Sequence, residues 1–431
     1  SIEVYRPLLI RSGEQEGLSF VNPNMVESVS FSSGGFGVDY GDKMSSVLDI
    51  RYKRPSHFEG SASISLLGAS AYVGHSNEKF SQMHGIRYKT SSYMLGALQT
   101  DAEYNPNFLD YQTYLTYDFS DKFGMFFLGN VSRNDFRFMP ISRETKFGTT
   151  NETFKFNVTF HGQEKDLFLT AFGALAFQYK VDEKSKLELL TSAFHTSESV
   201  SYDIKGSYFL SQGSDLNFNN DLESAGVSSY YEHARNKLGA SVVNVSLLGT
   251  HKLPFNELKW GATYQRAIID DEIGEWELRD SAGYSMPGNI NGMSLYDNLK
   301  SKQDLSSNRL SLYIQDTYTR QTAKGKVNLS GGVRLSYWDF NKEVLLSPRV
   351  AVSWFPSKFP NLGLRAATGI YYQSLFYKEI KKEVTDEYGN SSIELNDNIK
   401  SPRSYQVILA SDYYFNIGKR PFKFTAEAYG K

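Results

Sequence analysis

Residues 326–338 read KVNLSGGVRLSYW, and apolar side chains alternate with polar ones along this stretch. Val327, Leu329 and Val333 fall on one face, whereas Asn328 and Arg334 fall on the other. Successive side chains of a β-strand point to opposite faces, so the stretch predicts a strand with one apolar and one polar face. Residues 421–431 repeat the pattern.

The same alternation recurs from residue 60 to the end of the chain, and the connections between the segments are short and long in turn. This rhythm is typical of a transmembrane β-barrel, in which one face of each strand meets lipid and the other meets a polar lumen. It predicts an all-β fold, a large antiparallel barrel with about 15 strands in this chain. The predicted strands are 61–73, 80–89, 93–99, 110–119, 123–138, 167–181, 186–209, 239–253, 257–284, 308–320, 326–341, 347–355, 362–373, 404–415 and 421–431.

The order of short and long connections assigns the short turns to the periplasm and the long loops to the outside. The predicted long loops cover 139–165, 210–238, 285–307 and 374–401. Keeping this order requires an extra turn at Thr90–Ser92, which the local sequence only hints at. Single-chain bacterial barrels have even strand numbers and an open edge is not stable in lipid, so an odd count predicts an incomplete barrel.

Composition limits the function classes. The net charge is −2 and the pI is about 6.4, which gives no electrostatic footprint for a nucleic-acid partner. The chain has no Cys, and its seven His are not spaced as metal ligands. No G-x-S-x-G elbow is present, so the sequence predicts no enzyme, no metal and no cofactor. An aromatic content of 15% fits the girdles of a membrane barrel, although a soluble aromatic-rich sandwich has a similar composition.

Residues 1–56 differ from the rest, because their apolar runs are short and a glycine-rich connection separates the last two. They predict a small α+β segment rather than barrel wall. Gly35–Gly41 reads G-x-G-x-x-x-G, one residue longer than the dinucleotide fingerprint, and no βαβ unit surrounds it. Tight turns explain these glycines better than a nucleotide site does.

Met25–Phe36, Asp39–Gly41 and Met44–Ile50 together resemble the end of the plug domain of TonB-dependent outer-membrane receptors. In that family a strand, a Gly, a Tyr-Gly pair, small residues and a β-branched strand lead into the barrel. The matching plug-motif residues are Gly34, Gly35, Tyr40, Gly41, Ser45 and Ser46. Ser45-Ser46 stands where many members have two glycines, a variant that resembles receptors of Bacteroidetes-type bacteria. Segments 2–7, 347–350, 365–373 and 420–429 resemble the same group.

The resemblance implies a 22-stranded barrel filled by an N-terminal plug, with energy for import transmitted by TonB from the inner membrane. Residues 1–56 would be the C-terminal part of the plug, and residues 57–431 would be an incomplete transmembrane barrel. The TonB-binding peptide would precede Ser1, and about seven further strands would follow Lys431. The implied partners are TonB, outer-membrane lipid and a SusD-like or other surface lipoprotein.

An acidic cluster is one candidate ligand site outside the plug motif; lumen-facing Arg334, Gln315 and Lys326 are others, with hydrogen bonds to the plug surface as the alternative role. The cluster contains Asp270, Asp271 and Glu272 beside Trp276, with Glu275, Glu277 and Asp280 nearby. Carboxylates bind Ca²⁺ or a cationic ligand, but the D-x-D-x-D-G loop is missing. The alternative is a solvated extracellular hairpin end. Asp270, Asp271, Glu272 and Trp276 are therefore predicted as substrate-facing loop residues.

Three functions remain open from the sequence. The first is an outer-membrane transporter that imports a scarce nutrient of the siderophore, glycan or peptide class. The second is a receptor-like barrel that serves as a structural or assembly component with a surface lipoprotein. The third is an outer-membrane hydrolase, for which the chain offers no catalytic constellation.

Overall fold

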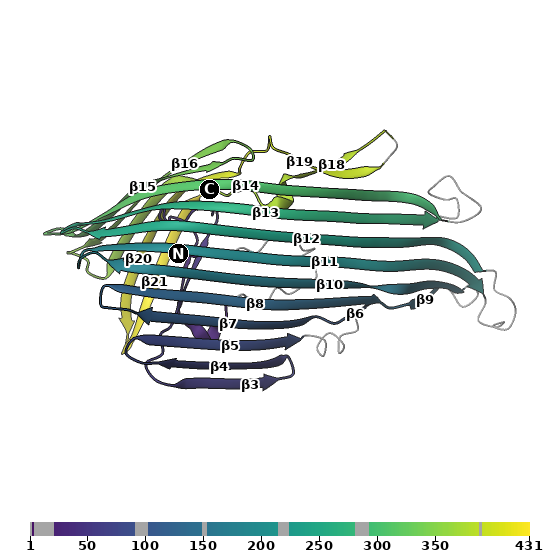
Figure 1. The fold of residues 1–431 in the computed structure, drawn as a ribbon, viewed down its shortest axis with the longest axis horizontal. Coiled ribbons are helices and arrows are strands. Elements are labelled where there is room, and N and C mark those ends of the chain that lie inside the picture. Colours follow the sequence, from purple (N-terminus) through teal and green to yellow (C-terminus); the bar gives the residue numbers. More distant parts are fainter. Residues whose placement is uncertain are drawn as a thin grey trace.

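The structure is a computed structural model that describes residues 2–3, 21–90, 102–148, 153–213, 224–280, 293–387 and 390–431. Its main body is an antiparallel sheet rolled into a barrel, with the strands in chain order (Figure 1). The wall strands are β3 (Glu59–Ser65), β4 (Gly68–Ser76), β5 (Phe80–Thr90), β7 (Asn107–Asp118), β8 (Phe123–Pro140), β10 (Thr153–Lys180), β11 (Ser185–Gly213), β12 (Ser224–Lys252), β13 (Asn256–Asp280), β14 (Ser294–Thr322), β15 (Gly325–Trp338), β16 (Glu343–Pro356), β17 (Leu362–Tyr372), β20 (Arg403–Ile417) and β21 (Arg420–Gly430).

The smaller elements lie beside this wall. The short strands β6 (Ala102–Tyr104) and β9 (Arg143–Gly148) pair with β8 and β10, and the hairpin of β18 (Lys381–Thr385) and β19 (Ser391–Leu395) belongs to the connection between β17 and β20. A separate two-stranded sheet joins β1 (Val26–Ser32) to β2 (Val47–Tyr52). The two 3₁₀ turns are η1 (Pro23–Met25) and η2 (Tyr377–Ile380).

The all-β barrel prediction is confirmed, and the wall has the predicted number of strands in a different arrangement. The extra turn lies between β3 and β4 at Leu66-Leu67, where the Thr90 amide donates to the Leu67 carbonyl (3.0 Å) and Gly68 has a φ of +134°. β5 pairs directly with β7, so these two strands are neighbours in the wall. The predicted strand 93–99 lies outside the described residues. Two leucines at the turn make 61–73 read as one continuous strand.

β3 and β21 are the first and last strands of the continuous series of registers, which runs from β3–β4 to β20–β21. Side chains of both strands are exposed at nearly every position. The completion of the barrel by further strands stays a prediction.

Strands β10–β14 are much longer than predicted, with 25 to 29 residues each. At about 3.3 Å per residue they span roughly 80–95 Å, far more than the apolar band of a barrel, about 25 Å tall. They extend past their shorter neighbours at the end opposite the short turns (Figure 1). The loops predicted at 139–165, 210–238 and 285–307 are therefore largely strand. The extensions carry many polar and charged residues, so the apolar alternation that marks a strand in the sequence is weaker there.

The N-terminal segment packs against the inner side of the wall. Met25 is buried with Tyr72 and Met83 of the wall, and Phe36 is buried with Tyr371. Among the described residues of 1–56 the only helix is η1, so the predicted α content is not supported. No described helix is long and apolar enough to cross a bilayer.

Candidate functional site

The glycine-rich turn of the N-terminal segment touches the inner wall too closely for a side chain. A Cβ on Gly41 would lie 2.2 Å from Cζ of Arg334, and one on Gly37 would lie 2.4 Å from Oε1 of Gln315. The Val38 amide donates a hydrogen bond to the same Gln315 oxygen (2.9 Å). Glycine is therefore required at these two positions because the wall side chains lie so close to the backbone.

The first two glycines of the motif contact the neighbouring part of the wall, strands β17 and β20. Gly35 has a φ of +66°, a left-handed conformation that favours glycine. A Cβ on Gly34 would lie 2.6 Å from Ile408, and one on Gly35 would lie 3.0 Å from Ala367. Gly34, Gly35 and Gly41 thus fit between wall strands β15, β17 and β20.

Arg349 of β16 holds the same turn through its backbone. Its Nη1 donates to the carbonyls of Gly37 (2.6 Å) and Tyr40 (2.8 Å), and its guanidinium lies 4.2 Å from the centre of the Tyr371 ring. The Tyr40 hydroxyl donates to Oδ2 of Asp49 (2.9 Å), and burial raises the pKa of Tyr40. The guanidinium and the carbonyls together fix the position of the turn.

The two serines of the motif follow at the start of β2. The Ser45 carbonyl accepts a hydrogen bond from Nζ of Lys431 (3.3 Å), and Ser46 is half-buried. Neither contributes to the pocket described below.

The connection between β17 and β20 folds inward as a strap, defined here as residues 373–402. Leu375, Tyr377 and Ile380 of the strap are buried against Trp338 of the wall. Arg309 lies 4.1 Å from the centre of the Trp338 ring and donates to the Leu375 carbonyl (3.1 Å). The predicted loop 374–401 is confirmed, with η2 and the β18–β19 hairpin inside it.

Asp271 anchors the strap. The Tyr377 hydroxyl donates to Oδ2 of Asp271 (3.0 Å), and Lys381 forms an ion pair with the same carboxylate. The Asp271 side chain is only 7% exposed. Burial, together with the Asp271 charge, raises the pKa of Tyr377. Asp271 is therefore a structural contact of the strap and not a solvated loop residue.

The structure does not bring the predicted acidic cluster together, because the four residues lie on strand β13 and not on a loop. Asp270 and Glu272 are exposed on the outward face, opposite to Asp271. Trp276 stacks on His233 of β12, with ring centroids 4.7 Å apart. No group of three or more acidic, His or Cys side chains in the described ranges is arranged to hold a metal ion.

The strap also contacts the N-terminal segment. Ser374 donates a hydrogen bond to Oδ1 of Asp42. Burial opposes ionisation of Asp42, but the nearby guanidiniums of Arg334 and Arg309 hold its pKa below the ordinary value. The wall arginines thus stabilise the charged carboxylate that the strap contacts.

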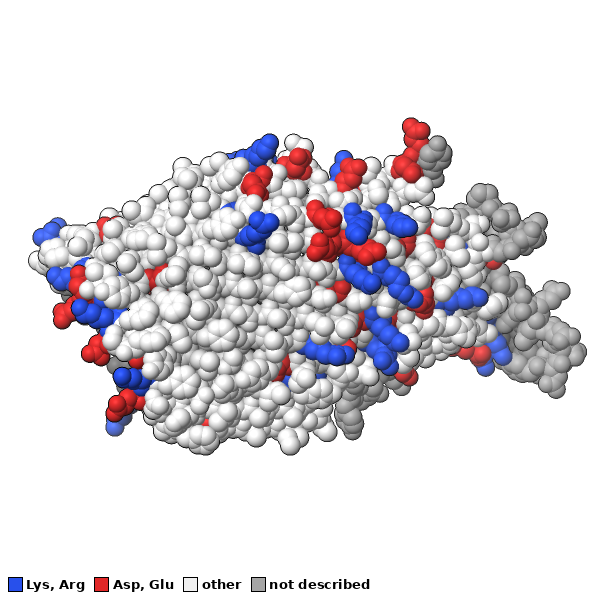
Figure 2. Space-filling view, viewed as in Figure 1, with Lys and Arg blue, Asp and Glu red and all other residues white. Residues whose placement is uncertain are grey.

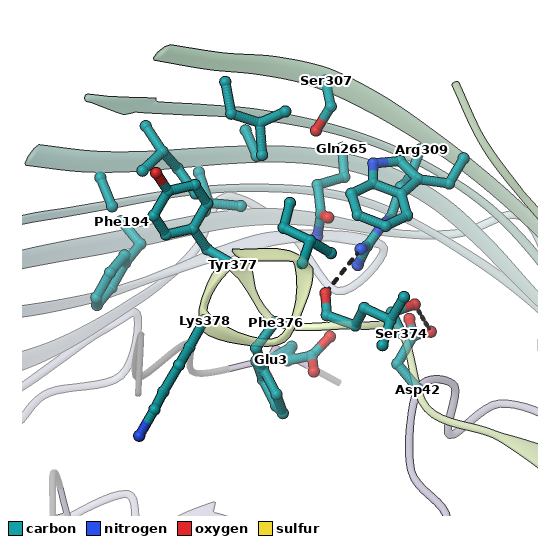
Figure 3. Close-up of a pocket in the computed structure, with 18 of the residues that line it drawn as sticks. Glu3, Asp42, Phe194, Gln265, Ser307, Arg309, Ser374, Phe376, Tyr377 and Lys378 are labelled. Atoms are coloured by element: carbon teal, nitrogen blue, oxygen red, sulfur yellow. Dashed lines mark hydrogen bonds between the residues drawn. The ribbon is translucent and has the colours of Figure 1, made fainter. Parts of the chain in front are cut away.

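A pocket of about 120 Å³ lies where the strap, the wall and the N-terminal segment meet (Figure 3). Its lining is mixed, with aromatic rings and charges of both signs. The described contributors include Glu3, Asp42, Lys43, Phe194, Gln265, Arg309, Trp338, Ser374, Phe376, Tyr377 and Lys378. The pocket is small, so the strap leaves little room in this state.

Sequence reasoning missed most of these residues. Arg309 and Trp338 belong to ordinary alternating strands, and their partners lie about 40 to 70 positions away in the strap. One signal was available, since Trp338 is one of only four Trp in the chain and is the last residue of β15.

The fold is similar to that of a solved outer-membrane barrel. The structure of the outer membrane transporter YddB from Escherichia coli matches with a TM-score of 0.51 and 11% identity, over 95% of this chain and 65% of that one. The RagAB peptide importer matches with a TM-score of 0.49 and 9% identity, over 80% and 42%. The ferric-catecholate import receptor Fiu from E. coli K12 matches with a TM-score of 0.39 and 9% identity, over 94% and 70%.

These similarities concern the fold alone. The chain spans 65% of the length of YddB. No family model and no curated protein matches the sequence.

Proposed function

We propose that the chain is part of an active outer-membrane transporter that imports a scarce nutrient of the siderophore, glycan or peptide class and depends on TonB. Residues 1–56 would be the C-terminal part of its plug, and residues 57–431 would belong to its barrel. The observation that carries the proposal is the position of the glycine-rich turn against the inner wall. Arg349 donates hydrogen bonds to its carbonyls, and Gly41 packs directly against Arg334.

The pocket supports import rather than passive diffusion. Sites for small ligands usually measure about 300–1,000 Å³, whereas this pocket has about 120 Å³. A nutrient of the proposed classes therefore needs the strap to move. Asp42 touches Ser374 of the strap, so a rearrangement of the plug and an opening of the strap are mechanically linked.

The test is uptake by the full-length protein in its own host, with and without the tonB gene. The proposal expects growth on the limiting nutrient to require both the transporter and TonB. Normal uptake without TonB would refute energy coupling. Co-purification of a surface lipoprotein together with the absence of any uptake would favour the structural role instead.

A further inference from the structure

The outward face of the barrel carries an apolar hollow of about 500 Å³ across strands β7, β8, β10, β11 and β12. Its floor consists of side chains too small to fill the surface. Gly173 of β10 pairs with Gly129 of β8 and Ala193 of β11, and Ala171 lies on the next outward row. The registers therefore place the small residues side by side.

The hollow faces away from the lumen. Phe172 and Phe194, which alternate with the floor residues, are buried on the inner side with Ile2 and Tyr52. At the rim of the hollow, Val131 and Val243 are half exposed. In a membrane barrel this outward face meets lipid.

A strip of small side chains runs from the hollow along the outward face, away from the short turns. Ser197, Ser199 and Ser201 follow one another on the outward face of β11, and Gly239 faces Ser197 from β12. Rows two residues apart are separated by about 6.6 Å. The strip thus rises about 20 Å from the His195 row to the Ser201 row.

Basic side chains stand along the upper end of this strip. Arg137, Lys165 and Arg235 share the row of Ser201 on adjacent strands, and Lys237 lies one row nearer the hollow. Within the described parts of the chain, the side chains of Arg137, Lys165 and Lys237 have no hydrogen bond or ion pair.

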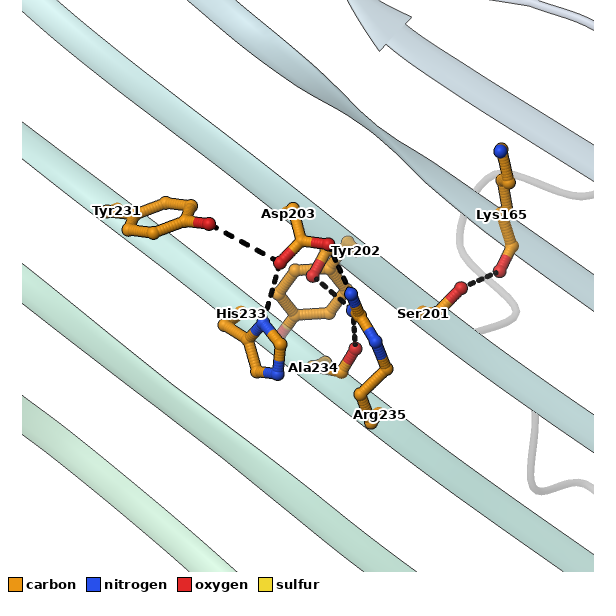
Figure 4. Close-up of polar contacts among 8 residues, drawn as sticks. All are labelled: Lys165, Ser201, Tyr202, Asp203, Tyr231, His233, Ala234 and Arg235. Atoms are coloured by element: carbon orange, nitrogen blue, oxygen red, sulfur yellow. Dashed lines mark hydrogen bonds and ion pairs between the residues drawn. The ribbon is translucent and has the colours of Figure 1, made fainter.

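The nearby carboxylates bind other cations. Asp203 accepts from His233 (2.6 Å) and forms an ion pair with Arg235, whereas Nζ of Lys165 lies apart from this group (Figure 4). Asp135 accepts two hydrogen bonds from the guanidinium of Arg133, of 2.7 and 3.0 Å. Glu272 lies opposite Lys237 in the register without an ion pair. Asp270 lies opposite Gly239 and also forms no ion pair among the described residues, so three free cations stand beside two free carboxylates, Glu272 and Asp270.

The charged residues of this face are unevenly distributed along the barrel. Figure 2 shows a broad zone without charged residues towards the short turns, and Lys, Arg, Asp and Glu gather beyond it. Phosphate groups of a lipid leaflet lie at such a border, and long basic side chains reach them while their stems stay on apolar surface.

We propose that this face is a binding site for a phosphorylated lipid of the outer leaflet. An acyl chain fills the hollow over Gly129, Gly173 and Ala193, and the phosphate groups lie against Lys165 and Lys237. The inference rests on the proposed outer-membrane setting. It does not depend on TonB or on the nutrient.

The test measures lipid retention by native mass spectrometry on the full-length protein, delipidated in mild detergent and titrated with lipid A. Dephosphorylated lipid A, phosphatidylethanolamine and inorganic phosphate are the comparison ligands. We expect selective retention of lipid A. Lys165→Ala combined with Lys237→Ala should weaken it about 30-fold, since each basic residue near a lipid surface contributes about fivefold. Lys122→Ala with Lys324→Ala, at the short turns, is the matched control and should leave it unchanged.

A second pair of variants tests the acyl chain. Ala171→Leu with Ala193→Leu should fill the hollow and reduce lipid A retention, whereas Ala366→Leu, on the outward face of β17, should not. A melting curve for each variant shows that the barrel is folded. Equal retention of lipid A and its dephosphorylated form, an equal loss in the lysine control, or binding of a second protein copy in place of lipid would overturn the proposal.

Discussion

Replacing Asp271 by Asn isolates the anchor of the strap. The carboxylate is 7% exposed and holds Lys381, which is 18% exposed, as well as the Tyr377 hydroxyl. Removing one partner of a buried ion pair costs about 3–5 kcal/mol. Asn keeps an acceptor for Tyr377, and Lys381 retains its place 4.8 Å from the Tyr377 ring centre. We therefore expect the closed strap to lose about 2 kcal/mol, which raises the open population about 30-fold.

Hydrogen exchange followed by mass spectrometry measures this population at the strap. Amides of η2 and of the β18–β19 hairpin should exchange about 30-fold faster in Asp271→Asn. The matched control is Asp270→Asn, because Asp270 is the neighbouring residue on the outward face and is exposed. Equal exchange in the wild type and Asp271→Asn, or equal acceleration in both variants, would refute the anchoring role.

Three further predictions concern substitutions at the contacts between the N-terminal segment and the wall. Gly41→Ala should lower the melting temperature, with a cost of about 1–3 kcal/mol, because its Cβ would lie 2.2 Å from Arg334, whereas Gly430→Ala, with no atom near its Cβ, should not. Arg349→Ala should make cells sensitive to large antibiotics, because the carbonyls of Gly37 and Tyr40 lose their donor; unchanged sensitivity at equal expression would contradict this. Asp42 has a lowered pKa despite burial, because Arg334 and Arg309 lie near it. Its stabilisation is complete above its ordinary pKa of about 3.9 and is lost as the pH falls through the folded value, so acid unfolding should be weaker in Asp42→Asn than in the wild type.

The strand count was predictable because the lipid-facing part of each strand alternates, as in 326–338. The position of the extra turn was not, since Leu66 and Leu67 continue the apolar pattern through it. Only the need for one more reversal between the N-terminal segment and the first long loop followed from the sequence. That requirement was right: the structure has a reversal at Leu66-Leu67, whereas the turn predicted at Thr90–Ser92 lies mostly outside the described residues.

The glycine motif was recognised from its residue types, but its physical meaning required the wall. Ile408 and Arg334 leave no room for a side chain at Gly34 and Gly41, and they lie roughly 290 to 370 positions later in the chain. The acidic cluster failed for the opposite reason. Adjacent carboxylates read as one patch in the sequence, but a strand sends Asp270 and Asp271 to opposite faces.

Two acidic residues hold the strap beside the pocket, in addition to other wall contacts such as that of Arg309 with Leu375. Asp271 of the wall binds Tyr377 of η2, and Asp42 of the N-terminal segment binds Ser374. The wall contact is made within a strand that has both neighbours in register, so it is fixed. The Asp42 contact is made by a segment whose own sheet has only two strands and is separate from the barrel. A force on the N-terminal segment therefore releases Ser374 before Asp271, and the strap opens first on the side that faces the pocket.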